Sequence, residues 1–326
     1  MRLEQPSDLL DPDALLRRPG ARLMVLAPHP DDESLAAGGL IQRALARAVP
    51  VSVVFITDGE NNPWPQRGLE HRLWIGGRQR EAWGARRRAE ADAALRALGA
   101  GGIDVHRLGW PDGGVTWKLL DDTVALRESL QRLIAQAAPT VLVLPDLVDR
   151  HPDHSAVHVL VEMVLHRLPR ATHPACLGYL LHGRSQRGVP RRAVFALTDA
   201  ERRRKLTALE AHASQMAFSR TRLLRFIAGN EAFVAGLDCH DRQGAMLPWR
   251  PPRVLRAGLA LLAVDAERGE QVRLGARGAG TALLWRDGTP AACVSRVLRP
   301  PFYVKLYSPL PSPWVFDGWG WCRFGA

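Results

Sequence analysis

Two short segments of this chain concentrate side chains that can bind a metal ion or move a proton. The first is "HPDDE", from His29 to Glu33, and the second is "HPDH", from His151 to His154. Neutral imidazoles and carboxylates are ligands that zinc prefers, and a catalytic zinc usually takes three protein ligands and keeps a position for water. Acids at a helix start alone would explain the carboxylates of the first segment but not His29. The two segments together predict a metal site.

Each segment follows a short apolar run that must position it. The run "RLMVLA" at 22–27 precedes the first segment, and "VLVL" at 141–144 shortly precedes the second. Continuous runs of Val, Ile and Leu are typical of strands buried on both faces of a parallel sheet. Because open α/β sheets bind ligands beyond the carboxyl ends of their strands, we expect both segments at one edge of the sheet.

The alternation of apolar runs with helical periodicity predicts an α/β fold, with a Rossmann-like, mostly parallel sheet and helices on both faces. The expected strands are 22–27, 51–57, 104–108, 141–144 and 177–181. The expected helices are 35–48, 80–98, 122–137, 155–168 and 199–212. Thr198 and Glu201 have the spacing of a capping box, which marks the start of the last helix.

The character of the sequence changes after residue 247. A Pro- and Arg-rich stretch, "PWRPPRVLR", leads into short β-like runs, and Asp287-Gly288 has the composition of a hairpin turn. We therefore predict two parts: a main domain at 1–247 that carries both segments, and a small β-rich C-terminal extension at 248–326 whose role the sequence leaves open.

The charge of the chain bears on its partners. The formal net charge is +11, mostly from arginine. An anionic partner, such as a phosphorylated substrate, nucleic acid or an acidic membrane surface, would explain this excess, and so would a solvated arginine surface. The chain has no RNA-recognition signature and no cysteine-histidine finger, which argues against nucleic acid.

Cysteine usage and hydropathy bear on location. The 4 cysteines contain no C-x-x-C pair, which argues against a cysteine zinc site or a disulfide scaffold and suits a reducing compartment. The start of the sequence has no apolar region of the secretory kind, and no apolar run is long enough for a transmembrane segment. We expect a cytoplasmic protein.

The polar segments and their neighbours resemble the PIG-L/LmbE family of zinc-dependent N-acetylglucosaminyl deacetylases. The resemblance extends from about residue 20 to 235 and leaves 248–326 uncovered. It rests on motifs that occur in the family's order: "APHPDDE", "TDGE", "RRRAEADAALRALG", "LGWPDGG", "HPDH", "KLTALEAHASQ" and "NEAF". The main domain is therefore expected to be an LmbE-like deacetylase domain.

The resemblance implies a role for each motif residue. It assigns one Zn²⁺ per chain to three ligands, which are His29, Asp32 and His154. Asp31 would be the general base, and His151 would be the electrophilic and proton-donating partner, oriented by Asp153.

Two further positions are expected at the substrate. Arg87 lies at the position of the family's R-x-x-E arginine, and Asp112 in "WPDGG" lies in a loop at the same edge of the sheet, so both could contact sugar hydroxyls or an anionic aglycone. A helix-surface ion pair of Arg87 with Glu90, and a turn aspartate before Gly113, explain the two residues equally well.

The implied activity is hydrolysis of the N-acetyl group of a GlcNAc-type amino sugar in a glycoconjugate, with release of acetate. The arginine excess is compatible with a phosphorylated or lipid-linked carrier, and the sequence leaves a homo-oligomer open. Two other functions also stay open. One is a metal-dependent phosphoester hydrolase, since clustered Asp and His can bind two cations. The other is a non-catalytic carbohydrate-binding module on the same fold.

Overall fold

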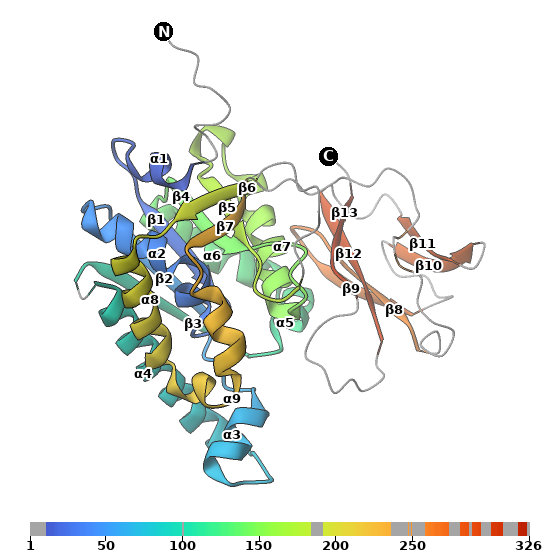
Figure 1. Cartoon of the computed structure of the whole chain (residues 1–326). Coiled ribbons are helices and arrows are strands. Elements are labelled where there is room, and N and C mark those ends of the chain that lie inside the picture. Colours follow the sequence, from blue (N-terminus) through green and yellow to red (C-terminus); the bar gives the residue numbers. More distant parts are fainter. Residues whose placement is uncertain are drawn as a thin grey trace. The chain divides into compact units, whose positions relative to one another are not determined.

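The computed structural model describes residues 11–99, 101–183, 192–235, 247, 249, 258–273, 281–286, 289–294, 301–308 and 319–324 (Figure 1). The chain divides into two compact units. Unit 1 comprises Met1–Gly113, Ala137–Asp146 and Pro174–Gly236, and unit 2 comprises Gly114–Gln136, Leu147–His173 and Leu237–Ala326. The predicted boundary between residues 247 and 248 stays a prediction.

Unit 1 is built on a seven-stranded sheet with the order β3-β2-β1-β4-β5-β7-β6. The first five strands in the chain run parallel, whereas β7 is antiparallel to both β5 and β6. The strands are β1 (Leu23–Ala27), β2 (Val51–Thr57), β3 (Ile103–Trp110), β4 (Val141–Pro145), β5 (Ala175–Tyr179), β6 (Arg192–Ala196) and β7 (Asn230–Ala235). Every residue of β1 and β4 is buried, as their continuous apolar sequences predict.

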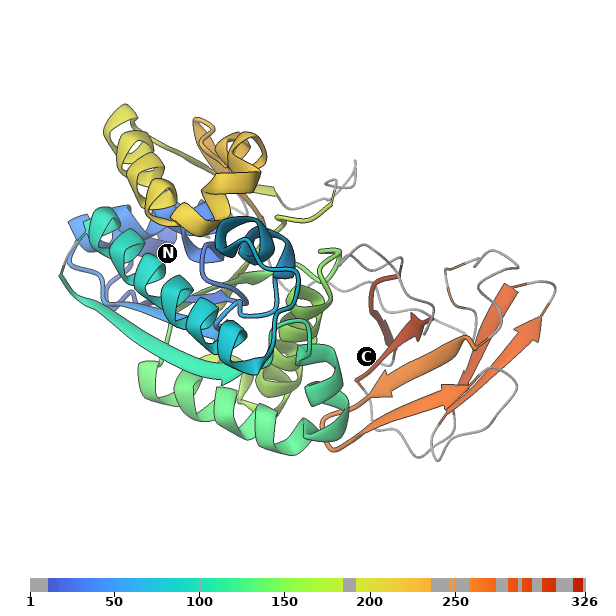
Figure 2. The same cartoon turned by 90° about the horizontal axis from the view of Figure 1, so that it is seen from below.

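In unit 1, α2 contacts β1, β2 and β7 and also α1, α4 and α8, whereas α9 packs on α3 and α8. Figure 1 and Figure 2 both show α4 and α8 side by side. The helices are α1 (Pro12–Leu16), α2 (Asp32–Ala46), α3 (Pro63–Glu70), α4 (Gly77–Gly99), α8 (Asp199–Ala211) and α9 (Ala213–Leu223), followed by the 3₁₀ turn η3 (Leu224–Phe226). The capping box of Thr198 and Glu201 is present, which confirms that expectation.

Helix α2 is broken one turn after it begins, because Ala37 has φ −134° and leaves the helical conformation. The break exposes backbone groups that an unbroken helix would pair internally. Glu231 accepts the N–H groups of Gly39 and Leu40 at 2.7 and 3.0 Å, and Lys205 donates to the carbonyl of Leu35 at 2.9 Å. The two charged groups also pair with each other at 2.6 Å. This buried ion pair therefore caps both sides of the break.

Unit 2 contains three helices and the described C-terminal strands. The helices are α5 (Val115–Asp121), α6 (Thr123–Ala137) and α7 (Pro152–Arg167), followed by the short η2 (Arg170–Thr172). A four-stranded antiparallel sheet has the order β13-β12-β8-β9, from β8 (Ala260–Val264), β9 (Gly269–Arg273), β12 (Phe302–Tyr307) and β13 (Cys322–Phe324). Helix α5 contacts β8 and β9. A Cβ at Gly269 would lie 2.5 Å from the backbone of Leu120, so only glycine permits this approach.

A separate antiparallel hairpin is formed by β10 (Thr281–Arg286) and β11 (Thr289–Val294). Its predicted turn residues, Asp287 and Gly288, lie outside the described residues. The mostly parallel sheet, its helices and the small antiparallel C-terminal sheet confirm the predicted fold class. In the part of the chain that the structure describes, no helix has the length and hydropathy needed to cross a membrane.

Candidate active site

The predicted site residues come from both units: those up to Asp112 lie in unit 1, and those from His151 to His154 lie in unit 2. In unit 1 the segment between β1 and α2 is buried, and its acids begin α2. The N–H of His29 donates to Asp32 Oδ2 at 2.9 Å, and His29 Nδ1 lies 3.4 Å from the same oxygen. An imidazole and a carboxylate are thus held side by side, out of solvent, at the carboxyl end of a central strand.

Asp31 has an unusual backbone conformation, with φ 132° and ψ −27°. Residues with a side chain rarely adopt positive φ, and such residues persist where their surroundings hold them. The Asp31 N–H donates to Glu33 Oε2 at 3.0 Å, and Arg87 donates to the carbonyl oxygen of the preceding residue, Pro30. The carbonyl and the N–H of the peptide bond between Pro30 and Asp31 are therefore both bound by buried side chains.

The environment of the Asp31 carboxyl changes its acidity. Burial raises its pKa to about 6, an effect that the positive charge of Arg87 opposes and the negative charge of Asp32 reinforces. Arg87 Nη2 lies 3.4 Å from Asp31 Oδ2. A carboxyl with a pKa near the working pH is suited to accept a proton from water and to return it.

Arg87 is 3% exposed, so its side chain does not lie on the solvent-exposed face of α4. Besides its bond to Pro30 and its ion pair with Asp31, it donates to the carbonyl of Gly59 at 3.1 Å. The alternative of a surface ion pair with Glu90 is wrong, because Glu90 pairs with Arg86 at 3.0 Å and accepts hydrogen bonds from Ser214. The contacts of Arg87 fix the backbone around the candidate base, and a contact with substrate stays a prediction.

Asp112 follows β3 and lies beside His29. Its Oδ1 is 3.2 Å from His29 Nε2, and its Oδ2 accepts the N–H of Asn61 at 2.8 Å. Burial acts to raise the pKa of Asp112, but the hydrogen bond and charge of His29 outweigh it, with help from Arg87 and Asn61, so the pKa is lowered. His29 therefore has a carboxylate beside each ring nitrogen, and this mixture of imidazole and carboxylates fits the ligand preferences of zinc.

Glu33 and His212 form a buried pair that motif reasoning had not placed in the site. His212 Nε2 lies 3.1 Å from Glu33 Oε1, which also accepts the hydroxyl of Ser34 at 2.7 Å. Burial acts to lower the pKa of His212, but the charge and hydrogen bond of Glu33, aided by Asp31, raise it overall. The signal in the sequence was the "AHASQ" motif. The partner of its histidine lies 179 residues away.

In unit 2 the second segment begins α7. His151 is the N-cap residue of α7, and its Nδ1 accepts the N–H of Asp153 at 3.3 Å. The carboxylate of Asp153 accepts the N–H of Val115 from α5 at 3.1 Å. The ring centroids of His151 and His154 are 5.0 Å apart. The cap thus fixes the His151 ring at the start of the helix.

Asp149 is a further residue that the sequence reasoning missed. It is buried, its Oδ2 lies 3.3 Å from His154 Nδ1, and its Oδ1 accepts the N–H of His151 at 2.9 Å. Carboxylates commonly hold metal-binding histidines in this way, because the contact fixes the ring orientation and the tautomer. The sequence "VDRHPDH" contains Asp149, but its spacing from the histidines did not distinguish it from the other acids of the segment.

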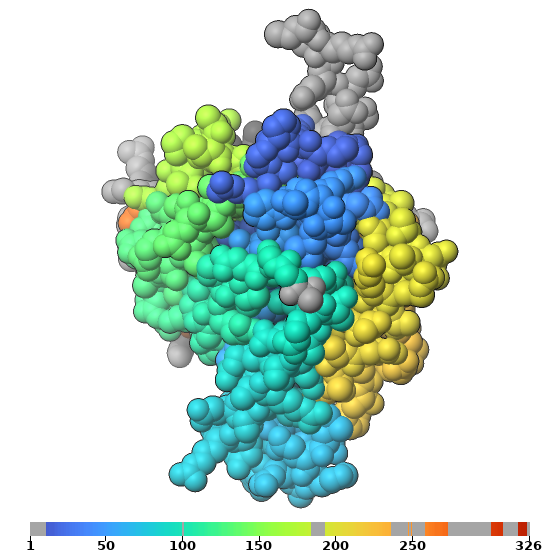
Figure 3. All heavy atoms as spheres, turned by 90° about the vertical axis from the view of Figure 1, so that its left-hand side faces the viewer, coloured from blue at the N-terminus to red at the C-terminus, as the bar shows by residue number. Residues whose placement is uncertain are grey.

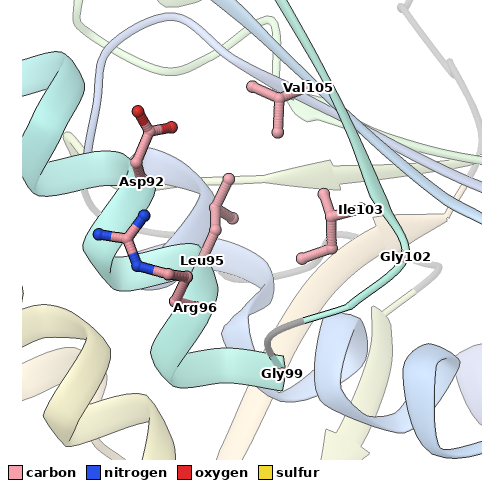
Figure 4. Close-up of a pocket in the computed structure, with 7 residues that line it drawn as sticks. All are labelled: Asp92, Leu95, Arg96, Gly99, Gly102, Ile103 and Val105. Carbon is pink, nitrogen blue, oxygen red and sulfur yellow. The ribbon is translucent and has the colours of Figure 1, made fainter.

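A hollow of about 180 Å³ in unit 1 lies away from these residues. Leu95 on α4 and Ile103 and Val105 on β3 line it, together with Asp92 and Arg96 (Figure 4). It sits at the beginning of β3, whereas the candidate residues follow the ends of the parallel strands. Ligands of open α/β sheets bind at the latter edge, so the hollow is not part of the candidate site.

Comparisons with known proteins agree with this geometry. Residues 24–165 match the PIG-L family model, described as GlcNAc-PI de-N-acetylase. The chain is 29% identical over 205 residues to 1D-myo-inositol 2-acetamido-2-deoxy-alpha-D-glucopyranoside deacetylase 1 of Saccharopolyspora erythraea, covering 55% of this chain and 63% of that protein. It is 27% identical over 205 residues to a probable N-acetyl-alpha-D-glucosaminyl L-malate deacetylase 2 of Bacillus anthracis, covering 62% and 85%.

Among solved structures, the zinc-inhibited form of a teicoplanin deacetylase is similar in fold. The TM-score is 0.51 at 16% identity, and the match covers 67% of this chain and 100% of that chain. The present chain aligns with less than two thirds of the length of the Saccharopolyspora relative. The family match nevertheless includes both polar segments, from His29 to Asp32 and from His151 to His154. Residues 24–165, which contain both polar segments, are therefore similar to the PIG-L family domain.

Proposed function

We propose that this protein is a zinc-dependent N-deacetylase. It hydrolyses the N-acetyl group of a GlcNAc-type amino sugar in a glycoconjugate and releases acetate. The observation that carries the proposal is Asp31, a buried carboxyl with a pKa of about 6 in a constrained backbone conformation, next to the imidazole and carboxylate of His29 and Asp32. This is the arrangement that amide hydrolysis needs, since an amide is a poor electrophile and its attacking water must lose a proton.

The proposed ligands of one zinc ion per chain are His29, Asp32 and His154. The order of the sheet supports this choice, because β1 and β4 are parallel neighbours and the two motifs follow their carboxyl ends. The contact of Asp149 with His154 Nδ1 supports it too, since it resembles the carboxylates behind metal-binding histidines. When bound, zinc supplies a Lewis acid that polarises the amide carbonyl and lowers the pKa of water.

Asp31 is proposed to accept the proton of the attacking water. Its pKa of about 6 leaves it ionised at neutral pH while it remains basic enough to be useful. His151 is proposed to stabilise the oxyanion that forms on the substrate, and Asp153 to orient its ring. The hydrogen bond from the backbone N–H of Asp153 to His151 Nδ1 supports the role of Asp153 in orienting the ring. The leaving amine then takes a proton from Asp31 or His151.

On the substrate side, Asp112 is proposed to bind sugar hydroxyls near His29. Arg87 remains a candidate for the same role, although its described contacts are with the protein itself. The names of the relatives place an N-acetylglucosamine unit on inositol or on malate, which suggests a small glycoconjugate for this chain as well. A phosphorylated or lipid-linked carrier is compatible with the net charge of +11.

Acetate release from a panel of N-acetylglucosaminides tests the proposal. We expect Asp31→Asn and His154→Ala to lower kcat/KM by about 100-fold or more, since each removes a proposed catalytic group. The matched control is Asp104→Asn, a carboxylate on β3 that is exposed to solvent and should leave the rate unchanged. Full activity in either site variant would overturn the mechanism.

Two measurements distinguish the proposed deacetylase from the two other functions, the phosphoester hydrolase and the binding module. One zinc per chain agrees with deacetylation, whereas two ions with phosphate release from a phosphoester would favour the hydrolase alternative. Tight binding of an N-acetylglucosaminide by the zinc-loaded protein without any acetate release would favour the binding module.

A further inference from the structure

Exposed apolar side chains of unit 1 gather on α3, the segment that follows it, and α9. We name Trp64, Leu73, Trp74 and Phe218 the aromatic tip. Their exposed fractions are 64%, 85%, 89% and 59%. Single exposed apolar residues are ordinary, but four large ones on neighbouring elements mark a surface that binds something.

The tip is held together by the packing of α3 on α9. The ring of Phe218 lies against Gly68, where a Cβ would come within 2.3 Å of it, so a larger residue at position 68 would displace the ring. Trp64 precedes Gly68 by four residues and therefore lies on the same side of α3. Figure 1 and Figure 2 both show α3 next to α9, and in Figure 3 the light-blue segment that includes α3 projects at one end of the visible face.

The charge around the tip is strongly positive. Residues 63–82 and 213–227 contain seven arginines and only two glutamates. Arg72 lies 3.9 Å from Glu70, and Arg220 pairs with Glu210 at 3.1 Å. Within the described ranges, four of the other arginines make no ion pair: Arg78, Arg80, Arg222 and Arg225. The partner of this surface must therefore offer both apolar material and negative charge.

We propose that the aromatic tip docks on the surface of an anionic lipid bilayer. Tryptophan rings favour the boundary between headgroups and acyl chains, and leucine and phenylalanine reach into the apolar side of it. Arginines beside them gain from the negative potential of anionic headgroups. Leu73 and Trp74 are adjacent in the chain and both almost fully exposed, which suits shallow insertion of a loop.

A second copy of this chain fits the tip less well. In a symmetric dimer the same patch would face itself, and the unpaired arginines of both copies would be brought together without acids to offset them. A bilayer with anionic lipids supplies that opposite charge.

The position of the tip links it to the candidate site. Helix α3 begins directly after Asn61 and Asn62, and Asn61 donates to Asp112, the carboxylate beside His29. Docking through the tip would thus bring the candidate site close to molecules carried in the bilayer. The docking itself does not depend on the proposed reaction.

Flotation of the full-length protein with lipid vesicles tests the proposal. We expect it to float with vesicles that contain phosphatidylglycerol, and about tenfold less with phosphatidylcholine alone or at high salt. The double variant Leu73→Ser/Trp74→Ser should lose about tenfold in bound fraction, and Arg78→Gln/Arg80→Gln should weaken both binding and its salt dependence. Val194→Ser is the matched control, since Val194 is an exposed apolar residue of β6, outside the tip.

Three results would overturn the proposal. The first is equal binding to both kinds of vesicle, and the second is full binding by the serine double variant. The third is a protein that does not float but self-associates, with the self-association abolished in this variant. The last result would identify a second copy as the partner. Acetate release from a water-soluble N-acetylglucosaminide separates the two proposals, because the serine double variant should retain it. Flotation of a wild-type protein that releases no acetate would support docking and overturn the proposed function alone.

Discussion

The carboxylate of Glu33 accepts the backbone N–H of Asp31 at 3.0 Å, across the first turn of α2. This bond helps to hold Asp31 in its positive-φ conformation. The other oxygen of Glu33 contacts His212. The backbone of Asp31, the proposed base, is thus held by the buried pair of Glu33 and His212, and His212 is the N-cap residue of α9.

The first prediction concerns His212. Its positive charge lowers the pKa of Asp31, so His212→Gln should move the acid limb of the kcat/KM profile from about pH 6 to higher pH. The rate at the optimum should fall by about 10- to 100-fold, as for other residues that support a metal site. His106→Gln, at a partly exposed histidine of β3, is the control. A lower rate with an unmoved acid limb would contradict a role through Asp31.

The same pair predicts how stability depends on pH. Because the pKa of His212 is raised in the folded protein, its protonation stabilises the fold below the ordinary histidine pKa of about 6.5, and this contribution is lost as the pH rises through the folded value. Urea unfolding should show the largest difference between wild type and His212→Gln in mildly acidic buffer. A difference that grows with rising pH would show that the sign is wrong.

Arg87 should act on kcat more than on KM. Arg87→Lys keeps a positive charge but cannot reach the carbonyls of Pro30 and Gly59 with a planar fork. Loss of the Asp31 backbone geometry should lower kcat by about 100-fold with little change in KM. Steady-state kinetics on an N-acetylglucosaminide check this. If Arg87 only bound substrate, KM would rise and kcat would survive.

Asp149 should set the affinity for zinc. Asp149→Asn retains the shape of the side chain but removes the charge beside His154 Nδ1. We expect the zinc Kd to rise by about 10- to 100-fold, measured by competition with a chelator. Asp146→Asn, at the first residue of the same strand-to-helix connection, provides a nearby control. An unchanged Kd in Asp149→Asn would remove this residue from the proposed site.

The ion pair at the break in α2 should be costly to disrupt. Glu231→Gln leaves the buried Lys205 without its counter-charge and should destabilise the fold by about 3 to 5 kcal/mol. Urea denaturation measures the loss. The double variant Lys205→Met/Glu231→Gln should recover part of it, because no buried charge is left unpaired. Equal stability of Glu231→Gln and wild type would mean that the pair is not needed at the break.

Local sequence predicted the central sheet well, for a physical reason. Strands such as β1 and β4 are buried on both faces, so their apolar runs are continuous and easily found. Strand β7 was not predicted, because its exposure alternates along the strand while the polarity of "NEAFVA" does not, since the polar Glu231 occupies a buried position. Helix α3 escaped too, since its prolines in "PWPQRGLE" are typical of a loop, although proline is tolerated in the first turn of a helix.

The motifs located the candidate residues but could not give their contacts. That Asp31 is a candidate base followed from its place in "HPDDE". Its positive φ, the bonds of Arg87 to two carbonyls, and the pairing of Glu33 with His212 depend on groups far apart in the sequence. The zinc ligands, the catalytic roles of His151 and Asp153, and the cytoplasmic location stay predictions.

The break in α2 also has a consequence for how the chain acquires its fold during synthesis. The N–H of Leu40 is capped by Glu231, which lies 191 residues later in the chain. While the ribosome is still adding those residues, the N–H groups of Gly39 and Leu40 after the break lack this cap. A fragment ending at residue 165, where the family match ends, contains the proposed zinc ligands, Asp31 and His151 but not His212, Lys205 or Glu231. The chemistry of the motif is encoded early in the chain, and its rigidity is completed late.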